Sequence, residues 1–240
     1  MSELLLETVG LRKNFGGVAA IDGVDFALNR GELRCLIGPN GAGKSTFFKM
    51  LTAQLRPTTG RVLLNGADVT RAEAHEIARR GVGIKNQVPD VFDNLSVREN
   101  LWLAARSRQT ARESRARAEE TLDRLHLRPL ASSLVGELAH GQRQWVELGM
   151  LLAREPQLIL LDEPAAGMTA QETERTAELI LEANRTATIV VVEHDMQFIR
   201  KIARRVTVFH QGRVLVEGTM AEIQEDQRVR DVYLGKAGLA

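Results

Sequence analysis

The sequence predicts an α/β protein in which a helical segment is inserted into a mixed α/β core. Two runs, Leu158–Leu161 and Thr188–Val192, have the length of a strand and are almost wholly apolar, which is typical of parallel strands buried on both faces. Between Ser96 and Arg154 the pattern is helical instead. We therefore expect one domain over residues 1–240, with residues 1–85 and 155–240 as the α/β core and residues 86–154 as the helical subdomain.

The N-terminal part is predicted to be an antiparallel β subdomain. Its strand candidates are separated by turn residues such as Gly16-Gly17 and Asn29-Arg30-Gly31. A helix is expected from Gly43 to Gln54, where Arg-Pro-Thr-Thr-Gly follows. The strands expected before residue 90 are Glu3–Val9, Val24–Asn29, Leu33–Gly38, Arg61–Gly66 and Gly81–Asn86.

Composition excludes several classes of function. The 32 Lys and Arg nearly balance the 31 Asp and Glu, and aromatic residues make up only 4%, which argues against a general nucleic-acid binder. Neither a signal peptide nor an apolar run long enough to cross a bilayer is recognisable, so we expect a soluble intracellular chain. The single cysteine, Cys35, lies in an apolar run and is expected to be a core residue rather than a reactive thiol.

The charged run Arg106–Glu120 has two interpretations. A solvated helix face is the favoured one, because charge runs at helical spacing usually face water. A binding patch for an acidic partner is the alternative.

A glycine-rich stretch, Gly38–Thr46, follows a predicted strand and opens a predicted helix. It has the spacing G-x-x-x-x-G-K-[ST], in which glycines let backbone N–H groups converge on a phosphate. Lys44 would bind the β- and γ-phosphates, and the Ser45 hydroxyl would ligate Mg²⁺. The residues of this predicted loop are Gly38, Pro39, Asn40, Gly41, Ala42, Gly43, Lys44, Ser45 and Thr46.

Two acids end the buried strand Leu158–Leu161. Ligands of open α/β sheets lie at the carboxyl ends of strands. Asp162 is therefore expected to hold Mg²⁺, and Glu163 to polarise an attacking water. A pair of solvated acids is the alternative, and the glycine-rich loop upstream makes it less probable.

Three further residues are candidates whose structural alternatives are strong when each is taken alone. His194 ends a buried strand and is placed to donate a hydrogen bond to the γ-phosphate, although most such histidines are structural. Gln87 is a candidate contact for Mg²⁺ or the attacking water. Phe15 is a candidate for stacking on adenine, and an isolated aromatic of this kind is more often part of a core.

The helix predicted after Leu138 begins without a capping hydroxyl. Ala139 stands where a serine would cap it, and His140-Gly141-Gln142 follows. A helix N-terminus with open N–H groups suits an anion, and nothing adjacent in sequence supplies one.

Taken in order, these elements resemble the ATP-binding cassette of ABC transporters over essentially the whole chain. The resemblance identifies Gly38–Thr46 as the Walker A loop, Gln87 as the glutamine loop, Leu158–Glu163 as the Walker B strand and His194 as the switch histidine. Leu138, Ala139, His140, Gly141 and Gln142 fall at the signature motif. The fold this implies is a P-loop NTPase with a RecA-like core sheet.

The family resemblance implies a partner for the open helix. In such cassettes the signature helix of one subunit caps the γ-phosphate held by the other, so two chains close head to tail around two ATP molecules with Mg²⁺. A second ATPase subunit, membrane permeases and, indirectly, a periplasmic substrate-binding protein are the implied partners. The location implied is the cytoplasmic face of the inner membrane.

Several segments favour a subgroup of importers. "PAAGM", "HDMQFI" and "VYLG" resemble importers of hydrophobic and branched-chain amino acids, whereas "HGQRQWVELGMLL" and "GMTAQETERTAEL" resemble the urea importer's ATPase most closely. Urea or a related small amide is thus the expected cargo, with branched-chain amino acids as the alternative. Two departures stand out: Ala139 replaces the signature serine, and Thr169 stands where the family has an aspartate.

Three competing functions remain open at this point. A lipid-export ATPase of similar length is the nearest. A soluble ABC ATPase of translation or DNA repair would usually carry tandem cassettes or long coiled-coil arms, which are not recognisable here. A clamp that binds ATP without turnover is disfavoured by the presence of Glu163 and His194.

Overall fold

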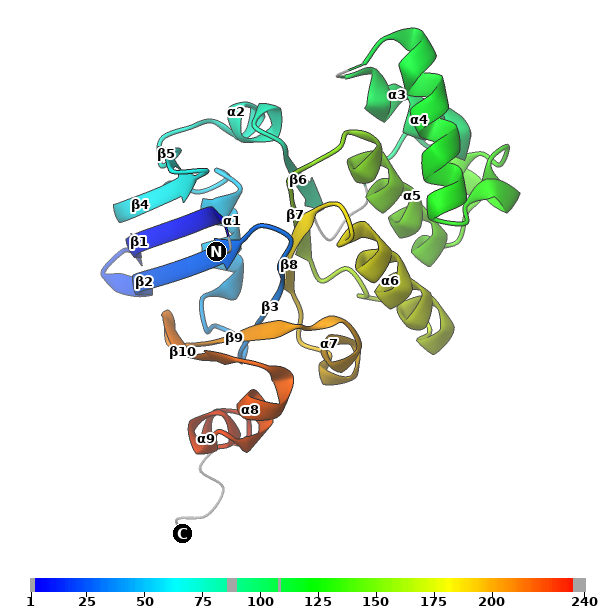
Figure 1. Ribbon diagram of the computed structural model, residues 1–240. Coiled ribbons are helices and arrows are strands. Elements are labelled where there is room, and N and C mark those ends of the chain that lie inside the picture. Colours follow the sequence, from blue (N-terminus) through cyan, green and yellow to red (C-terminus); the bar gives the residue numbers. More distant parts are fainter. Residues whose placement is uncertain (1–2, 86–89, 108, 235–240) are drawn as a thin grey trace. The chain divides into compact units, whose positions relative to one another are not determined.

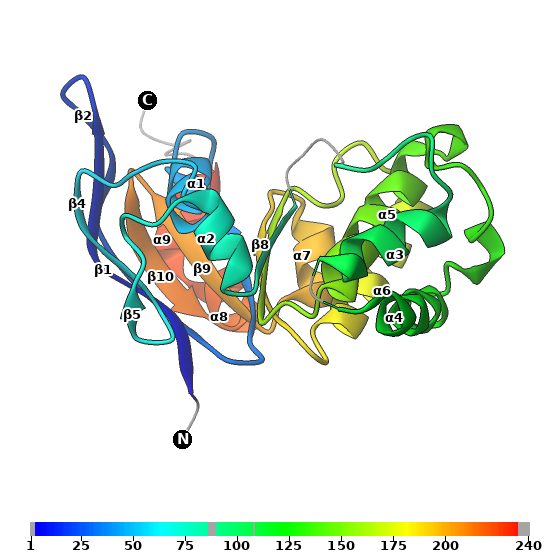
Figure 2. The ribbon, with the colours of Figure 1, turned by 90° about the horizontal axis from the view of Figure 1, so that it is seen from above.

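The structure is a computed structural model that describes residues 3–85, 90–107 and 109–234. Its contacts divide the chain into two compact units. The first, here the nucleotide-loop unit, comprises Met1–Arg80 and Thr188–Ala240, and the second, the signature unit, comprises Gly81–Ala187 (Figures 1 and 2). The functional division at residues 85 and 155 stays a prediction.

The nucleotide-loop unit begins with an antiparallel sheet, as predicted. Its order is β2-β1-β4-β5, with bounds Leu4–Phe15 (β1), Val18–Asn29 (β2), Thr59–Leu64 (β4) and Ala67–Asp68 (β5) (Figure 1). The first strand was expected to end at Val9 but continues to Phe15. It does so because pairing with β2 shifts register between Thr8 and Leu11, and this irregularity accommodates Gly10 at φ +55°.

A second set of strands in this unit contains one of the two predicted buried runs, Thr188–Val192. Its order is β10-β9-β3-β8, with bounds Leu33–Ile37 (β3), Thr188–Val192 (β8), Arg205–His210 (β9) and Arg213–Gly218 (β10). The strand β3 pairs in parallel with both β8 and β9, and β10 returns antiparallel to β9. Every residue of β3 and β8 is buried, which explains why these strands are apolar apart from Arg34 in β3 and Thr188 at the start of β8.

Helices complete the nucleotide-loop unit. They are Lys44–Leu51 (α1), Ala74–Arg79 (α2), Met196–Ile202 (α7), Met220–Glu225 (α8) and Gln227–Leu234 (α9). The helix α1 was expected to reach Gln54 but ends at Leu51, because Ala53 takes a left-handed conformation at φ 57°. Phe47 anchors α1 in the core, with ring centroids 5.5 Å from Phe26 and 5.1 Å from Phe209.

The signature unit is mainly helical, with two parallel strands. Its elements are Val82–Lys85 (β6), Val97–Arg106 (α3), Ala111–Arg124 (α4), Arg128–Leu130 (η1), Val135–Glu137 (η2), His140–Ala153 (α5), Leu158–Asp162 (β7) and Ala170–Ala183 (α6). Ser96 caps α3 with its hydroxyl and Glu99 returns a bond to the Ser96 N–H, a complete capping box.

The charged run that forms α4 is a solvated helix face, as expected. Only uncharged side chains of α4 are buried: Ser114, Ala118, Thr121 and Leu122. The charged residues form ion pairs at the surface, such as Arg98 with Glu119 and Arg117 with Glu120. Exposed pairs of this kind contribute little to stability but keep the face soluble.

Two expectations from composition concern the core and the membrane. Cys35 is fully buried, and burial raises the pKa of its thiol above the ordinary range, so it is a core residue. Among the described residues, none of the helices combines the length and the hydropathy that crossing a bilayer requires.

A buried arginine connects the two strand systems of the nucleotide-loop unit. Arg34, on β3, is 2% exposed. Its guanidinium donates to Glu32, Thr207 and Glu217 at 2.6, 2.8 and 2.7 Å, and to the Ala27 carbonyl of β2 at 3.2 Å. The planar donor fork of arginine suits several acceptors at once, which lysine could not serve.

Replacing this arginine should be costly. We expect Arg34→Met to lower the free energy of unfolding by about 3 kcal/mol, because it leaves carboxylates and a hydroxyl without their donor in a nearly dry site. Urea unfolding of the purified chain measures this. As a control, Arg56→Met removes an arginine from the exposed pair with Glu73 and should cost less than about 1 kcal/mol. Equal losses for the two variants would contradict the role given to Arg34.

Candidate functional site

The glycine-rich loop turns between β3 and α1 in the nucleotide-loop unit. Gly43, the residue before α1, has φ +103°, and a Cβ added there would lie 2.6 Å from the Ala20 carbonyl oxygen. Only glycine tolerates both the conformation and the contact. The first turn of α1 carries no acidic residue and its N-terminus receives no side-chain cap. An open, unopposed helix N-terminus of this kind suits a phosphate.

Lys44 is positioned on this loop as the motif requires. Its ammonium donates to the carbonyl oxygens of Gly38 and Pro39, at 2.6 and 3.1 Å. The side chain is 9% exposed, and these two carbonyls hold the charge at the mouth of the loop. A triphosphate is therefore a fitting ligand for the residues present: a fixed cation and convergent N–H groups.

Gly212, far away in sequence, supports the loop from the other side. Its N–H donates to the Ala42 carbonyl at 2.9 Å, and its carbonyl accepts from the Asp22 N–H at 2.8 Å. A Cβ at Gly212 would lie 2.8 Å from the Ala20 carbonyl oxygen, the same atom that crowds Gly43. The turn between β9 and β10 and the strand β2 thus hold the loop between them. No motif in the sequence pointed to Gly212.

Phe15 is exposed rather than part of a core. Half of its surface is open to solvent at the end of β1, and the Lys13 ammonium lies 5.2 Å from its ring centroid. The core interpretation is therefore wrong for this side chain. An exposed ring beside a β-hairpin turn is available for stacking, which leaves the adenine contact as a prediction.

His194 also projects into solvent. Its side chain is 64% exposed, directly after β8. The buried Glu193 accepts from the backbone N–H groups of His194 and Asp195 at 2.8 and 3.2 Å, and Asp195 in turn caps α7. The backbone is thus held on both sides of the histidine, and most of its ring surface is exposed.

In the signature unit, the two candidate acids follow β7. Four buried apolar residues precede Asp162, which is half-buried, and Glu163 comes next at φ +46°. A left-handed conformation is unfavourable for glutamate and is often found at functional sites, where surrounding structure maintains it. It turns the chain directly after the strand.

A buried ion pair in the signature unit was not anticipated from the sequence. Lys85, the last residue of β6, lies 3.5 Å from the Glu147 carboxylate of α5, and both side chains are nearly inaccessible. The other Glu147 oxygen accepts from the Asp90 N–H at 3.1 Å. Burial lowers the pKa of Lys85 and raises that of Glu147, while each opposes the shift of the other. Asp162 further favours the charged lysine.

Glu147 thus contacts residues on both sides of positions 86–89. Gln87 falls within that segment and lies outside the described residues, so its proposed role stays a prediction. In the structure, Lys85 and Asp90 both contact Glu147, which lies on the helix that begins at the signature motif.

The helix α5 begins as the sequence suggested, without a hydroxyl cap. The Gln142 side chain accepts from the Ala139 N–H at 3.1 Å, which is the only half of a capping box that alanine permits. Leu138 is half-buried, Ala139 and His140 are exposed, and His140 Nε2 lies 3.1 Å from the Gln144 amide nitrogen.

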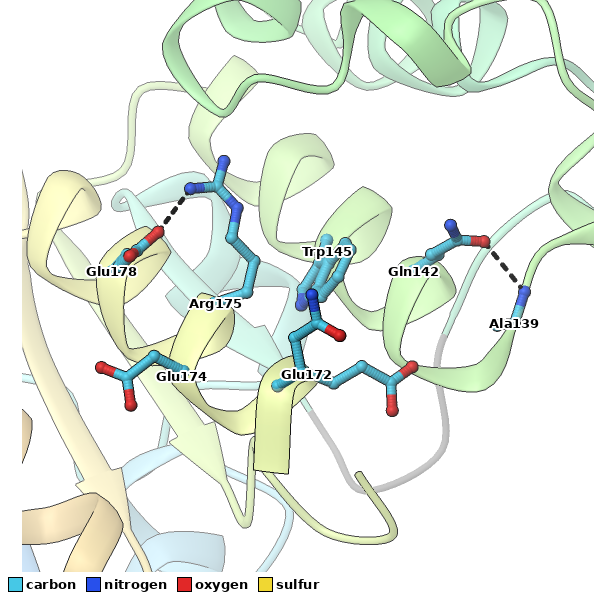
Figure 3. A pocket seen from close by; sticks show the side chains of 8 residues that line it. Ala139, Gln142, Trp145, Glu172, Glu174, Arg175 and Glu178 are labelled. Atoms are coloured by element: carbon cyan, nitrogen blue, oxygen red, sulfur yellow. Dashed lines mark hydrogen bonds and ion pairs between the residues drawn. The ribbon is translucent and has the colours of Figure 1, made fainter. Parts of the chain in front are cut away.

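An open pocket of about 520 Å³ lies beside this helix start (Figure 3). It is lined by Ala139, Gln142, Trp145, Gln171, Glu172, Glu174, Arg175 and Glu178. Trp145 donates to the Thr176 hydroxyl at 2.9 Å and so joins α5 to α6. Figure 3 shows Glu172 extending from α6 toward the Ala139–Gln142 turn.

The predicted site residues are therefore distributed over both units. Phe15, the loop Gly38–Thr46 and His194 belong to the nucleotide-loop unit. Asp162, Glu163 and the stretch Leu138–Gln142 belong to the signature unit.

Each unit carries a candidate residue whose oxygen atoms are of the kind that magnesium prefers. Ser45 is exposed in the first turn of α1, and Asp162 ends β7, so both offer the hard oxygen ligands that Mg²⁺ prefers. No group of three His, Cys, Asp or Glu side chains suited to a metal occurs within residues 3–85, 90–107 and 109–234. Ligation by one or two side chains plus phosphate oxygens is the usual arrangement for this ion.

Comparison with known proteins identifies the family. Residues 21–166 match the model of the ABC transporter family, and residues 213–238 match that of the branched-chain amino acid ATP-binding cassette transporter. Among curated proteins, the chain is 33% identical to BraF of Pseudomonas aeruginosa and 35% identical to LivG of Escherichia coli K12. Both are high-affinity branched-chain amino acid transport ATP-binding proteins, and each comparison covers 99% of this chain and all of the relative.

Other similar proteins include an export ATP-binding protein and two cassettes of known structure. The lipopolysaccharide export ATP-binding protein LptB of Acidithiobacillus ferridurans is 35% identical, with 98% of each chain covered. The crystal structure of MJ1267 with ADP, an ATP-binding cassette of an ABC transporter, superposes with a TM-score of 0.85 at 28% identity, covering 97% of this chain and 99% of that one. A dimeric post-hydrolysis structure of the cassette MJ0796, with ADP and phosphate, has a TM-score of 0.77 at 26% identity, covering 90% and 99%. The predicted cassette fold is confirmed.

The contact of Gly212 with the Walker A loop leads to a prediction. Gly212→Ala should weaken ATP binding about tenfold, because its methyl group would push Ala20 and the loop apart. Titration with a fluorescent ATP analogue measures this. Gly66→Ala is the matched control: its φ is +73° against +75° for Gly212, but nothing lies within 4 Å of the added Cβ. It should lose some stability and keep its affinity, and equal weakening in both variants would contradict the prediction.

Proposed function

We propose that this chain, which belongs to the ATP-binding cassette family of transporter ATPases, is the ATP-hydrolysing subunit of an importer for branched-chain amino acids. Overall identity does not separate importers from exporters, since LivG and LptB are equally similar at 35%. The observation that carries the proposal is the match of residues 213–238 to the branched-chain amino acid transporter model. This replaces urea as the favoured cargo, and urea remains the second candidate on the segments "HGQRQWVELGMLL" and "GMTAQETERTAEL".

The residues of the nucleotide-loop unit would bind ATP. Phe15 stacks on the adenine, and the N–H groups of Gly38–Thr46 surround the β- and γ-phosphates. Lys44, already held at the loop by two carbonyls, exchanges one of them for a phosphate oxygen. Ser45, Asp162 and Gln87 hold Mg²⁺, which when bound neutralises charge on the phosphates.

The remaining residues would carry hydrolysis. Glu163 accepts a proton from the attacking water and so increases its nucleophilicity. His194 donates a hydrogen bond to the γ-phosphate as negative charge develops on its oxygens, and Gln87 orients the water. The exposure of His194 supports this role, because a ring packed in a core could not reach a ligand.

Hydrolysis would require two chains. The stretch Leu138–Gln142 contacts the γ-phosphate on a second ATPase subunit, which is either a copy of this chain or a related one. The dimeric cassette MJ0796 supports such pairing. Permeases would bind the helical subdomain at residues 86–154 and hold the chain on the cytoplasmic face of the inner membrane, with the periplasmic binding protein as an indirect partner. Nucleic acid is not an expected partner.

An open groove in the signature unit supports contact with a permease. It has a volume of about 310 Å³ and includes Phe92, half of whose surface is exposed. Asp90, Leu103 and Met150 also line it. An exposed aromatic residue beside an apolar groove suits a short amphipathic helix from a membrane partner.

Removing the carboxylate of Glu163 should separate binding from hydrolysis. Glu163→Gln is expected to bind ATP as the parent does and to hydrolyse it at least about 100-fold more slowly, because an amide is not a base. The ATP-bound pair should then accumulate, which gel filtration with light scattering detects. Lys44→Ala should instead lose ATP binding itself. A Glu163→Gln chain that hydrolyses at the parent rate would refute the assignment of this residue.

The cargo can be tested in cells that lack the chain. Uptake of labelled leucine should fall to the background level and return with the parent gene but not with Lys44→Ala, since an ATPase that cannot bind nucleotide cannot drive import. Uptake of labelled urea, measured in parallel, should be unchanged. Loss of urea uptake with normal leucine uptake would favour the second candidate, and normal uptake of both would contradict the importer proposal.

A further inference from the structure

The N-terminus of the signature helix α5 is in contact with an anion from its own chain. The Glu172 carboxylate, on α6, lies against Gly141, and its interaction with the Gly141 N–H lowers the pKa of Glu172. Gly141 is buried, and a Cβ added to it would lie 2.5 Å from one Glu172 carboxylate oxygen and 2.8 Å from the carboxyl carbon. The close approach therefore depends on glycine at position 141 and on glutamate at position 172.

Glu172 is shared between two helices. One oxygen, Oε2, accepts from the N–H and the hydroxyl of Thr169, both at 2.9 Å, and so completes the capping box of α6. The other oxygen, Oε1, faces Gly141. Bonds from Thr169 and, to a smaller extent, from Gly141 hold the pKa of Glu172 below its usual range, so the side chain is an anion at neutral pH.

The position of Glu172 compensates for what α5 lacks. Ala139 offers no capping hydroxyl, and the first turn of α5 contains no acidic residue. A negative charge near a helix N-terminus is stabilising, and here it comes from a neighbouring helix instead of from the preceding loop. Gly141 belongs to the stretch Leu138–Gln142, which the proposed function places against the γ-phosphate of the other subunit.

We propose that Glu172 occupies the phosphate-binding end of the signature helix as an internal anion, which the ATP of the other subunit must displace before two chains can pair. The inference rests on the proposed function and adds a residue that regulates the same site. A single N–H cannot serve a carboxylate and a phosphate at full strength, and two anions at one helix end repel each other. Glu172 thereby raises the ATP concentration at which pairing occurs.

Displacement of Glu172 is feasible because only one of its contacts has to break. The bonds from Thr169 to Oε2 can persist while Oε1 turns away into the open pocket of about 520 Å³ beside it (Figure 3). Arg175 lines that pocket and pairs with Glu178. A carboxylate turned into this open pocket meets water, so opening costs little solvation energy.

The test uses a charge-neutral variant that preserves the cap. Glutamine serves as well as glutamate at this position of a capping box, so Glu172→Gln keeps the cap of α6 through its amide oxygen. It removes the negative charge and places an NH2 group, which cannot accept from the Gly141 N–H, where Oε1 was. The variant is made on the Glu163→Gln chain, in which ATP is not consumed. Sedimentation analysis at a series of ATP concentrations then gives the concentration for half-maximal pairing.

We expect Glu172→Gln to lower that ATP concentration about three- to tenfold, the usual range for one partly exposed charge at an interface of two chains. The effect should shrink at high salt, because mobile ions screen the repulsion between carboxylate and phosphate. Glu174→Gln is the matched control. Glu174 lies on the same helix and lines the same pocket, but the carboxylate that lies against Gly141 is that of Glu172. It should leave the ATP requirement unchanged.

Each other outcome has a distinct meaning. If the Glu163→Gln parent pairs with ATP and Glu172→Gln pairs at the same or a higher ATP concentration, the inference is overturned while the proposed function stands. An equal gain from Glu174→Gln also overturns it, because the effect would then be one of overall charge. If the parent itself does not pair with ATP, neither alone nor with a second ATPase subunit, the proposed function fails and the inference with it.

Discussion

Close packing of backbone around the Walker A loop is the constraint on which the rest of the nucleotide-loop unit depends. Gly43 and Gly212 come from positions far apart in sequence, yet an added Cβ at either would meet the carbonyl oxygen of Ala20. Three segments therefore meet through backbone atoms: the loop before α1, the strand β2 and the turn between β9 and β10. A loop held in this way presents its N–H groups in a preformed arrangement, so that little ordering remains to be done when a phosphate binds.

Buried charges have a different role in each unit. Arg34, on β3, donates to acceptors on β2, β9 and β10 and to Glu32, so a single side chain joins these strands. In the signature unit, Glu147 holds Lys85 and the Asp90 N–H to α5. A buried ion pair is seldom the most stable choice, since apolar residues of the same volume often serve better. The pair lies close enough to Asp162 for the two charges to interact. This indicates that fixing the side chains at the ends of β6 and β7 matters more here than the stability of the fold.

The elements that sequence reasoning predicted are those whose chemistry is local. The Walker A spacing, the apolar run before Asp162 and the helical pattern of residues 96–154 each depend on neighbours along the chain, and periodicity shows such features. Gly212, Lys85–Glu147 and Glu172 were missed because each acts through a segment distant in sequence. A glycine in a β-turn and a glutamate near a helix start have ordinary local explanations. Boundaries erred for a related reason, since the end of α1 depends on the single conformation of Ala53.

The helix N-termini of this chain differ in whether a side chain caps them, and this difference follows their proposed roles. Most described helices start at a side chain that accepts hydrogen bonds from the first turn, namely Ser96, Thr110, Thr169, Asp195 and Thr219. The helices α1 and α5 have no side-chain oxygen at this position. At a capped helix end, side-chain oxygens already accept from the first N–H groups. At an uncapped end these N–H groups lack protein partners, which is unfavourable and makes the end suited to bind an anion. Both α1 and α5 are helices to which the proposed function assigns phosphates, one in the same subunit and one in the other. For α5 the Glu172 carboxylate supplies the anion within the free chain, which reconciles an open helix end with the stability of the unpaired molecule.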